Sequence, residues 1–269
     1  MGIFSSFFGD KDKTVAQKNS KKEVVFEVDG DNARMLAAFN EARKTFRYFW
    51  REQSWEYQRI IPKLDFSCVK VMFSEEIDGE LLVEHMWIND VYFDGKFIYG
   101  TLINEPNDLR GTKNGDKIKV ELADISDWMF ASDGKVCGGF SIQAMRATMS
   151  TDERVEHDKA WGMEFGDPSR VMLVSEQDEH PENLHEHPMS VNMKKSLTEF
   201  LDKNPSEATS VDDDGYTMLH RQAIAGNASM VEILLEYGAD KNARTPDKLT
   251  ALELARAVGW EHVVAVLER

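Results

Sequence analysis

The sequence has little cysteine, no long hydrophobic run and too few basic residues to balance its acidic ones. Its two cysteines, Cys68 and Cys137, are too few for a disulfide framework or a cysteine metal site. They are typical of a reduced, cytoplasmic chain, with a single bridge between them as the alternative. No apolar run approaches the roughly 18 residues that a membrane-spanning helix needs. We therefore expect a cytoplasmic protein that has no membrane partner.

The shortage of basic residues excludes one class of partner. The chain has 48 Asp and Glu against 32 Lys and Arg, which gives a formal net charge of −16. Because like charges repel, neither a nucleic-acid backbone nor an anionic membrane surface is expected to bind, whereas a basic protein would be attracted. The charge is spread along the chain: residues 31–165, 166–211 and 212–269 carry −7, −5 and −4, and residues 1–30 are neutral. It is therefore not the charge of one acidic tail.

Residues 1–22 are predicted to form a mobile tail. The start of the chain lacks the basic flank and the long apolar stretch of a secretory signal. Gly2 and Ser6 match the loose pattern for N-terminal acylation, which applies only in a eukaryotic host. A tail that frays, or that docks through its phenylalanines, is the favoured interpretation.

A helix is predicted to follow, capped by Asp31 or Asn32 and running to about Trp50. One face carries apolar side chains at steps of three and four residues, namely Leu36, Phe39, Ala42, Phe46 and Phe49. The opposite side is basic, with Arg34, Lys44, Arg47 and Arg51. This basic side is either a docking surface or a solvated one, and we favour the solvated surface.

From Phe66 the periodicity changes to that of strands. Asp-Gly pairs at 78–79, 94–95 and 133–134 each separate two strand-like runs, and such pairs favour two-residue hairpin turns. The predicted strands cover residues 66–75, 80–91, 96–104, 117–122, 127–131 and 135–139, an antiparallel meander. Helices are predicted over residues 140–148 and from 150 to about 161, where Ser150 and Glu153 match a capping box.

The C-terminal part contains a repeat of 33 residues. Aligning residues 214–242 with 247–269 pairs Thr217 with Thr250, Leu219 with Leu252, Gly226 with Gly259, Val231 with Val264 and Leu234 with Leu267. This period resembles the ankyrin repeat. The resemblance implies two helices per repeat, and residues 196–205 match the outer helix of a degenerate leading repeat. The last repeat departs from the family pattern at Ala251 and Glu253.

The ankyrin resemblance implies a protein partner, because such stacks are binding scaffolds without catalytic machinery. Partners usually contact the turns that precede the helices. The candidate partner-binding residues are Asp212, Asp213, Asp214, Tyr216, Arg244 and Lys248. Two and a half repeats are fewer than the about three that a stack needs for stability, so we expect the repeats to dock on the linker or on the first domain.

Four short stretches of the first domain resemble the YegJ-like bacterial family of unknown function: Glu84-His85-Met86-Trp87, Asn104-Glu105-Pro106, Asp127-Trp128-Met129 and Gly138-Gly139-Phe140. The resemblance covers roughly residues 30–165, and it implies an α+β fold and a bacterial origin but no catalytic residues. On the residues alone, a possible first-domain site comprises Glu84, His85, Trp87, Asn104, Glu105, Asp127 and Trp128. Either its ionisable groups act as general acid or base, or they are hydrogen-bonded core groups, the interpretation we favour.

The acidic linker contains three histidines, His180, His185 and His187. A His-x-His pair is a weak metal signal, so no metal and no cofactor is predicted, and the role of these histidines stays open.

The predicted organisation is a tail over residues 1–22, an α+β domain over 23–165, a linker over 166–190 and ankyrin repeats, one degenerate and two full, over 191–269. The fold class is α+β, a helix with an antiparallel meander, followed by a short all-α stack. We expect a non-enzymatic module that binds a basic protein, with an immunity-type inhibitor of a toxin as the finer hypothesis. The alternative is a small-ligand binder or enzyme that uses Glu84 or His85, Glu105 and Asp127.

Overall fold

The computed structural model describes residues 33–269. The predicted tail and the predicted cap at Asp31 or Asn32 lie outside the described residues. The chain forms two compact units. The sheet unit comprises the described residues up to 45 together with 64–92 and 97–172, and the repeat unit comprises 46–63, 93–96 and 173–269. Each unit is described here by itself.

The predicted first helix is α2, Ala33–Glu56, and its two halves belong to different units. Phe39, Ala42, Phe46 and Phe49 are buried, as the apolar periodicity predicts, whereas Leu36 is exposed. The helix continues past Trp50 because Trp55 is also buried. One expectation is wrong: Arg51, assigned to a solvated surface, is only 1% exposed, because the rings of Tyr48 and Trp260 lie beside it in the repeat unit.

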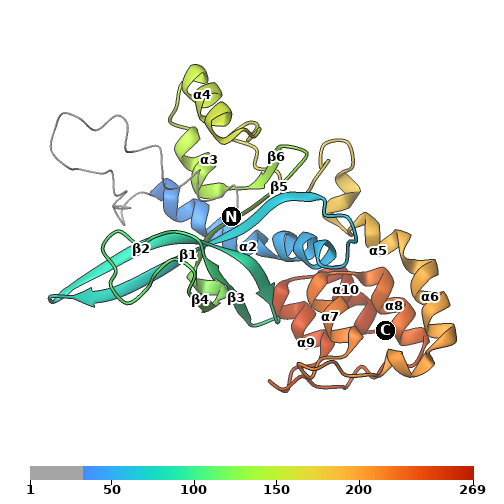
Figure 1. Ribbon diagram of the computed structural model, residues 1–269. Coiled ribbons are helices and arrows are strands. Elements are labelled where there is room, and N and C mark those ends of the chain that lie inside the picture. The colour runs from blue at the N-terminus through green and yellow to red at the C-terminus, as the bar shows by residue number, and fades with distance from the viewer. Residues whose placement is uncertain (1–32) are drawn as a thin grey trace, which may run out of the picture. The chain divides into compact units, whose positions relative to one another are not determined.

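All six predicted strands are present in one antiparallel sheet (Figure 1). They are β1 Leu64–Ile77, β2 Glu80–Phe93, β3 Phe97–Leu102, β4 Lys117–Glu121, β5 Ile125–Ser132 and β6 Lys135–Gly138. Their spatial order is β4-β3-β2-β1-β5-β6, so the meander holds for the first four strands, and β5 then pairs with β1. Every residue of β5 is buried, and the strand lies inside the sheet between β1 and β6. The Asp-Gly turns at 78–79 and 133–134 have the predicted positive φ at both residues.

Two helices complete the sheet unit, α3 Phe140–Arg146 and α4 Thr151–Trp161. The predicted capping box at Ser150 and Glu153 is present. Ile142 and Phe165 pack in one apolar cluster with side chains of the sheet, among them Cys68, Trp87 and Met129. This cluster lies beside the polar residues of the sheet unit that are described below.

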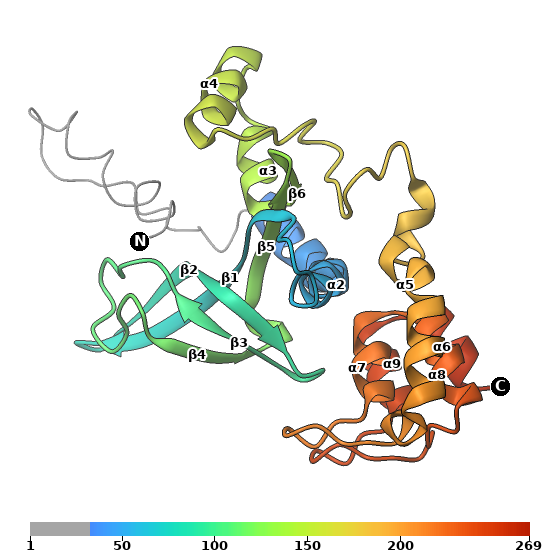
Figure 2. The same ribbon diagram turned by 45° about the vertical axis from the view of Figure 1, so that its right-hand side comes forward.

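The repeat unit contains short helices in the predicted ankyrin pattern. They are η2 Pro181–Leu184, α5 Pro188–Asn192, α6 Lys194–Lys203, η3 Pro205–Ala208, α7 Met218–Ala225, α8 Ala228–Glu236, α9 Ala251–Val258 and α10 Glu261–Leu267. Thr217 and Thr250 form capping boxes at the starts of α7 and α9, and Gly226 and Gly259 end these helices in the left-handed conformation. These features recur after 33 residues. Helices α7 and α9 lie side by side (Figure 2).

The core of the repeat unit joins α6 to the helices α7 to α10. Leu201 of α6 packs in the same buried cluster as Leu219 of α7 and Leu234 of α8. Trp260, the residue before α10, belongs to this cluster too. Tyr48 of α2 packs against this cluster. The stack is therefore supplemented by residues from outside the repeats. None of the helices in residues 33–269 has the length and apolar character to cross a membrane.

Candidate functional site

The first candidate site is the turn surface, defined as Asp212, Asp213, Asp214, Tyr216, Arg244 and Lys248. In the turn before α7, the Asp212 carboxylate accepts the N–H groups of Asp214, at 3.0 Å, and Tyr216, at 2.9 Å. Arg221 forms ion pairs with Asp212, at 2.8 Å, and Asp214, at 2.9 Å. Its guanidinium also lies 4.0 Å from the centre of the buried Tyr216 ring. One arginine thus orders this acidic turn, and Asp213 is exposed beside it.

Burial on its own would raise the pKa of Asp212, but the Tyr216 N–H and the Arg221 guanidinium outweigh it and lower the pKa. The carboxylate is therefore charged at neutral pH. With three aspartates and one arginine, the turn keeps an excess of negative charge.

The corresponding turn of the next repeat carries the basic members of the turn surface. Arg244 donates to the Lys248 carbonyl at 2.5 Å and lies 3.6 Å from the Glu253 carboxylate. Lys248 has φ +65°, and its N–H donates to the Thr245 carbonyl at 2.8 Å. The two turns are adjacent, because a Cβ added to Gly215 would lie only 2.7 Å from Pro246 Cγ. The structure therefore brings all six predicted residues onto two neighbouring turns.

The inner helices of the repeats are contacted by the chain itself. Residues 93–96 belong to the repeat unit, and a Cβ on Gly95 would lie 2.6 Å from Leu254 Cδ2 and 3.1 Å from Ile224 Cδ1. Ile224 and Leu254 are both buried. Lys96 lies 3.7 Å from the Asp247 carboxylate. The apolar side of α7 and α9 is therefore covered at this point, while the turn surface is not.

The second candidate site, in the sheet unit, centres on Lys70 of β1. Lys70 pairs in register with Trp87 on one side and with Asp127 on the other. Its Nζ donates to Ser141 Oγ at 3.0 Å and lies 4.7 Å from the centre of the Trp87 ring. Lys70 and Ser141 contact the predicted residues Trp87 and Asp127. The sequence did not indicate either of them, because neither belongs to a motif within its own strand or helix.

Asp127 is fully buried, and both of its carboxylate oxygens accept hydrogen bonds. Its two oxygens accept the N–H groups of Trp128, Phe140 and Ser141, each at 2.8 Å, and the Ser141 hydroxyl at 2.6 Å. Burial raises the pKa of this carboxyl, while Lys70 and the hydrogen bonds from Ser141 oppose the rise. The carboxylate satisfies the first N–H groups of α3, which is the work of a helix cap.

The other predicted residues of this unit have separate tasks. Glu84 accepts the N–H groups of three consecutive loop residues, 107–109, at 2.7–3.1 Å. Asn104 Oδ1 accepts the Trp87 N–H at 2.6 Å, and Trp128 Nε1 donates to the Ala42 carbonyl at 3.0 Å. Glu105 is exposed. Trp87 and Asp127 thus share Lys70, while Glu84 and Trp128 anchor different parts of the unit.

His85 lies 5.0 Å from Phe39, measured between ring centres. Burial, with Lys70 and Arg43 nearby, lowers the pKa of His85 to about 4. The ring is therefore neutral at pH 7, and its Nδ1 has no hydrogen-bond partner within the described part of the chain.

The three linker histidines have three different environments. His187 is buried and its Nε2 lies 3.1 Å from the Glu52 carboxylate, which also pairs with Arg59 at 2.9 Å. His180 lies 3.0 Å from Glu182. The His185 ring lies 4.5 Å from that of His262. In residues 33–269, no three His, Cys, Asp or Glu side chains gather so as to hold a metal ion.

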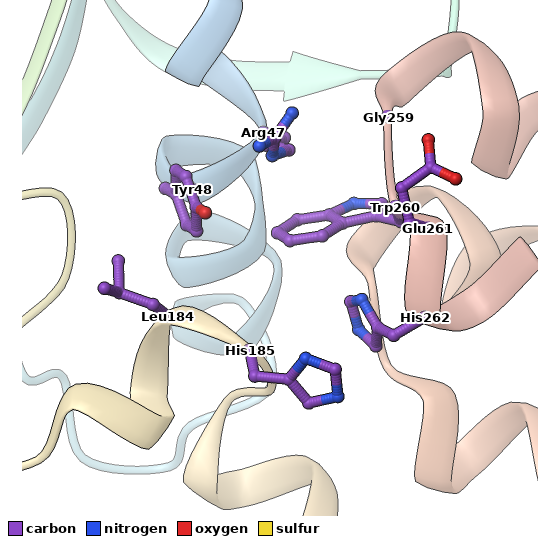
Figure 3. A pocket seen from close by; sticks show the side chains of 8 residues that line it. All are labelled: Arg47, Tyr48, Leu184, His185, Gly259, Trp260, Glu261 and His262. Carbon is purple, nitrogen blue, oxygen red and sulfur yellow. The ribbon is translucent and has the colours of Figure 1, made fainter.

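A hollow of about 210 Å³ lies in the repeat unit beside this histidine pair (Figure 3). Arg47 and Tyr48 of α2 form one wall, Leu184 and His185 of the linker another, and Trp260 and His262 a third. Sequence reasoning missed this site, since its residues come from three distant segments. The only signal was the four-residue spacing of Arg47 and Arg51 on one side of a helix.

Comparison with known proteins assigns the first part of the chain to one family and the repeats to another. Residues 32–165 match the family described as an uncharacterized protein conserved in bacteria, DUF2314, and residues 201–255 match ankyrin repeats. An ankyrin repeat protein of Neisseria meningitidis serogroup B is 49% identical over 245 residues, covering 91% of this chain and 97% of that protein.

Two further relatives match only parts of the chain. The uncharacterized protein YegJ of Escherichia coli is 32% identical over 73 residues, which cover 27% of this chain and 48% of YegJ. The ARF GTPase-activating protein Git of Drosophila melanogaster is 40% identical over 81 residues, 30% of this chain and 11% of Git. Both resemblances predicted from the sequence, to the YegJ-like family and to ankyrin repeats, are confirmed.

Proposed function

The chain belongs to the bacterial family that joins the uncharacterized domain DUF2314 to C-terminal ankyrin repeats, and on this premise we propose that it binds a protein partner through the turn surface of the repeats. Ankyrin repeats indicate protein–protein interaction. The assignment to the turn surface is the finer part of the proposal.

One observation carries this assignment. The apolar side of the inner helices α7 and α9 is contacted by residues 93–96 of the same chain, with Gly95 close to Ile224 and Leu254. A partner that used this side would have to displace them. The turns before α7 and α9 carry exposed charged side chains on neighbouring loops, so a partner can reach them without displacing residues 93–96.

The chemistry of the turns favours a basic partner. Asp212 and Asp214 are held by Arg221, while Asp213 is exposed and has no ion pair among the described residues. Together with the net charge of −16, the acidic turn before α7 would attract a positively charged protein and speed its association. Inhibition of a basic toxin, as immunity proteins achieve it, is the narrower form of the proposal and rests on charge complementarity. We place the protein in the bacterial cytoplasm, where its two buried cysteines, which form no disulfide, would stay reduced.

A charge reversal on the full chain tests the turn surface. Asp213→Lys should lose the partner that the wild-type protein captures from its native lysate, because the exposed acidic charge becomes basic. Glu80→Lys makes the same change of charge on an exposed residue of β2 and should leave capture intact. Quantitative mass spectrometry of the captured proteins measures both. Equal capture by all three proteins would exclude the turn surface.

The salt dependence of binding tests the electrostatic part. The affinity for a basic partner should fall as ionic strength rises, since screening weakens exposed charge pairs. A captured partner that is acidic, or whose affinity does not change with salt, would contradict the proposed class of partner.

The alternative drawn from the sequence, an enzyme or small-ligand binder that uses Glu84 or His85, Glu105 and Asp127, has less support from the geometry. The carboxylates of Glu84 and Asp127 accept N–H groups of their own chain. A general base needs an oxygen that is free to reach a substrate proton. Alanine at Glu105, which is exposed, would test this alternative directly.

A further inference from the structure

The hollow beside Trp260 concentrates positive charge in an acidic protein. Arg47 lies on its wall and Arg51 lies one helical turn further along α2. The guanidinium carbons of Arg47 and Arg51 are 5.1 and 5.3 Å from the centre of the Tyr48 ring. They are 5.5 and 5.3 Å from the centre of the Trp260 ring. Both cations therefore lie against the same two aromatic walls.

These two arginines have donor groups that the protein does not use. Arg47 Nε and Arg51 Nη1 are buried and have no hydrogen-bond acceptor among residues 33–269. Arg51 is 1% exposed, and its one described hydrogen bond runs from Nη2 to the Asn183 carbonyl at 2.5 Å. Burial lowers the pKa of Arg51 to about 10. A buried guanidinium without an anionic partner is costly, and an anion placed nearby would offset that cost.

Two histidines line the opposite side of the hollow, and one of them, His185, adds a donor. His262 Nε2 donates to the Gly226 carbonyl at 2.9 Å, so its Nδ1 is an acceptor in the neutral ring and His262 contributes a wall but no donor. The neighbouring ring of His185 is exposed and hydrogen-bonds to none of the described residues. Figure 3 shows the two imidazole rings turned toward one another at the lower edge of the hollow.

The nearby carboxylates are occupied or directed elsewhere. Glu186 accepts the Ser190 hydroxyl and the Ser229 N–H, and Glu52 is bound by His187 and Arg59. Glu261 belongs to the lining, but Figure 3 shows its carboxylate pointing away from the two histidine rings. Glu52 and Glu186 offset part of the positive charge of Arg51, but no carboxylate of the described residues forms an ion pair with Arg47 or Arg51.

We propose that this hollow is a binding site for a small oxyanion, held by Arg47 and His185, with Arg51 adding positive charge from the next turn of α2. Guanidinium and imidazole N–H groups are the donors that phosphate and carboxylate oxygens accept best. The volume, about 210 Å³, is below the about 300–1,000 Å³ of sites for drug-sized molecules, which restricts the ligand to a small one. The site uses no residue of the turn surface, so it is independent of partner binding there.

Titration of the full chain with inorganic phosphate tests the site. Isothermal titration calorimetry at about pH 7, with sodium chloride holding the ionic strength constant, should show saturable binding at one site. The intrinsic tryptophan fluorescence, to which Trp260 contributes, should change over the same concentration range. Sulfate and acetate, titrated in parallel, distinguish the source of the oxyanion: binding of phosphate and sulfate identifies a tetrahedral anion, and binding of acetate identifies a carboxylate. Either result supports the proposal.

Matched variants separate this site from general charge effects. Arg47→Gln should weaken phosphate binding by about tenfold or more, the usual effect of losing one charge-assisted hydrogen bond. Arg34→Gln removes the same charge from an exposed position of the same helix and should leave the affinity unchanged. Because His185 is exposed, His185→Gln is expected to fold normally and to weaken binding by about threefold, whereas His180→Gln should not. The proposal is overturned if none of the three anions saturates, or if Arg34→Gln and His180→Gln weaken binding as much as their counterparts.

Discussion

Two fully buried arginines, one in each unit, differ in whether their charge is paired with a carboxylate. Arg146 of the sheet unit donates to Gln143 Oε1 at 2.6 Å and to the Gly166 carbonyl at 3.0 Å, and it pairs with the Asp158 carboxylate at 2.8 Å. Arg51 of the repeat unit has one carbonyl acceptor and no ion pair in the described chain. Both side chains are at most 2% exposed.

The difference shows how to distinguish a structural charge from one that is available to a ligand. Arg146 joins α3, α4 and the segment that follows them, so its charge is neutralised and its position is determined by three partners. Asp127, also in the sheet unit, is satisfied in the same way by four donors. A buried arginine that pairs with a carboxylate has a structural role, whereas a buried arginine without an ion pair beside a hollow indicates a ligand.

The largest expected effect is that of removing Arg146. Arg146→Met should lower the free energy of unfolding by about 3–5 kcal/mol, because Asp158 and Gln143 lose their buried partner. Urea unfolding followed by circular dichroism measures the change. Arg34→Met, at an exposed position, serves as the control and should stay within about 0.5 kcal/mol of wild type. A loss of less than about 1 kcal/mol for Arg146→Met would show that the network is not structural.

A smaller effect is expected from the pH dependence of His85 in the sheet unit. Its folded pKa is about 4, below the ordinary value of 6.5, because burial and the charges of Lys70 and Arg43 disfavour protonation. The unfolded chain therefore takes up the proton first as pH falls. The stability that neutral His85 contributes is fully present above about pH 6.5 and is lost progressively as pH falls toward 4.

His85→Gln removes this titration and should reduce the loss of stability between about pH 7.5 and pH 5 by on the order of 1 kcal/mol, since solvent partly screens a half-buried ring. His180→Gln, at an exposed position, should leave the pH dependence as it is in wild type. Urea unfolding at both pH values measures the difference. An identical pH dependence for His85→Gln and wild type would contradict the lowered pKa.

The smallest effect is expected for Arg51, and it is the sharpest test of the comparison. Arg51→Met should change the free energy of unfolding by less than about 1 kcal/mol in either direction, because it removes an unpaired buried charge and keeps most of the apolar contact. The measurement is the same urea unfolding as for Arg146→Met. A loss as large as that for Arg146→Met would mean that Arg51 is structural.

Much of the fold follows from local patterns. The Asp-Gly turns locate the strand ends, because positive φ at two successive residues is costly for most other residue types. The 33-residue period predicts the caps at Thr217 and Thr250 and the helix ends at Gly226 and Gly259. What these patterns do not predict is the pairing of β5 with β1, because no turn signal links the two strands.

Of the two candidate sites in the repeat unit, one follows from the sequence and the other does not. The turn surface is contiguous in sequence within each repeat, and the period brings its two halves together, so its six residues follow from the sequence. The hollow combines α2, the linker and the start of α10, and the sequence alone places Arg47 and Arg51 on a solvated side of a helix. Only the packing of Tyr48 and Trp260 reveals that Arg51 is buried.

The sequence by itself determined the acidic charge, the absence of a cysteine framework, the α+β class of the first part and the ankyrin character of the second. These depend on composition and on periods of 2, 3.6 and 33 residues, which act over short distances along the chain. Tertiary structure alone decided which charges are satisfied. Asp127 accepts four hydrogen bonds and Arg146 pairs with the Asp158 carboxylate, whereas Arg51 forms no ion pair among the described residues, because these contacts depend on groups that meet only after folding.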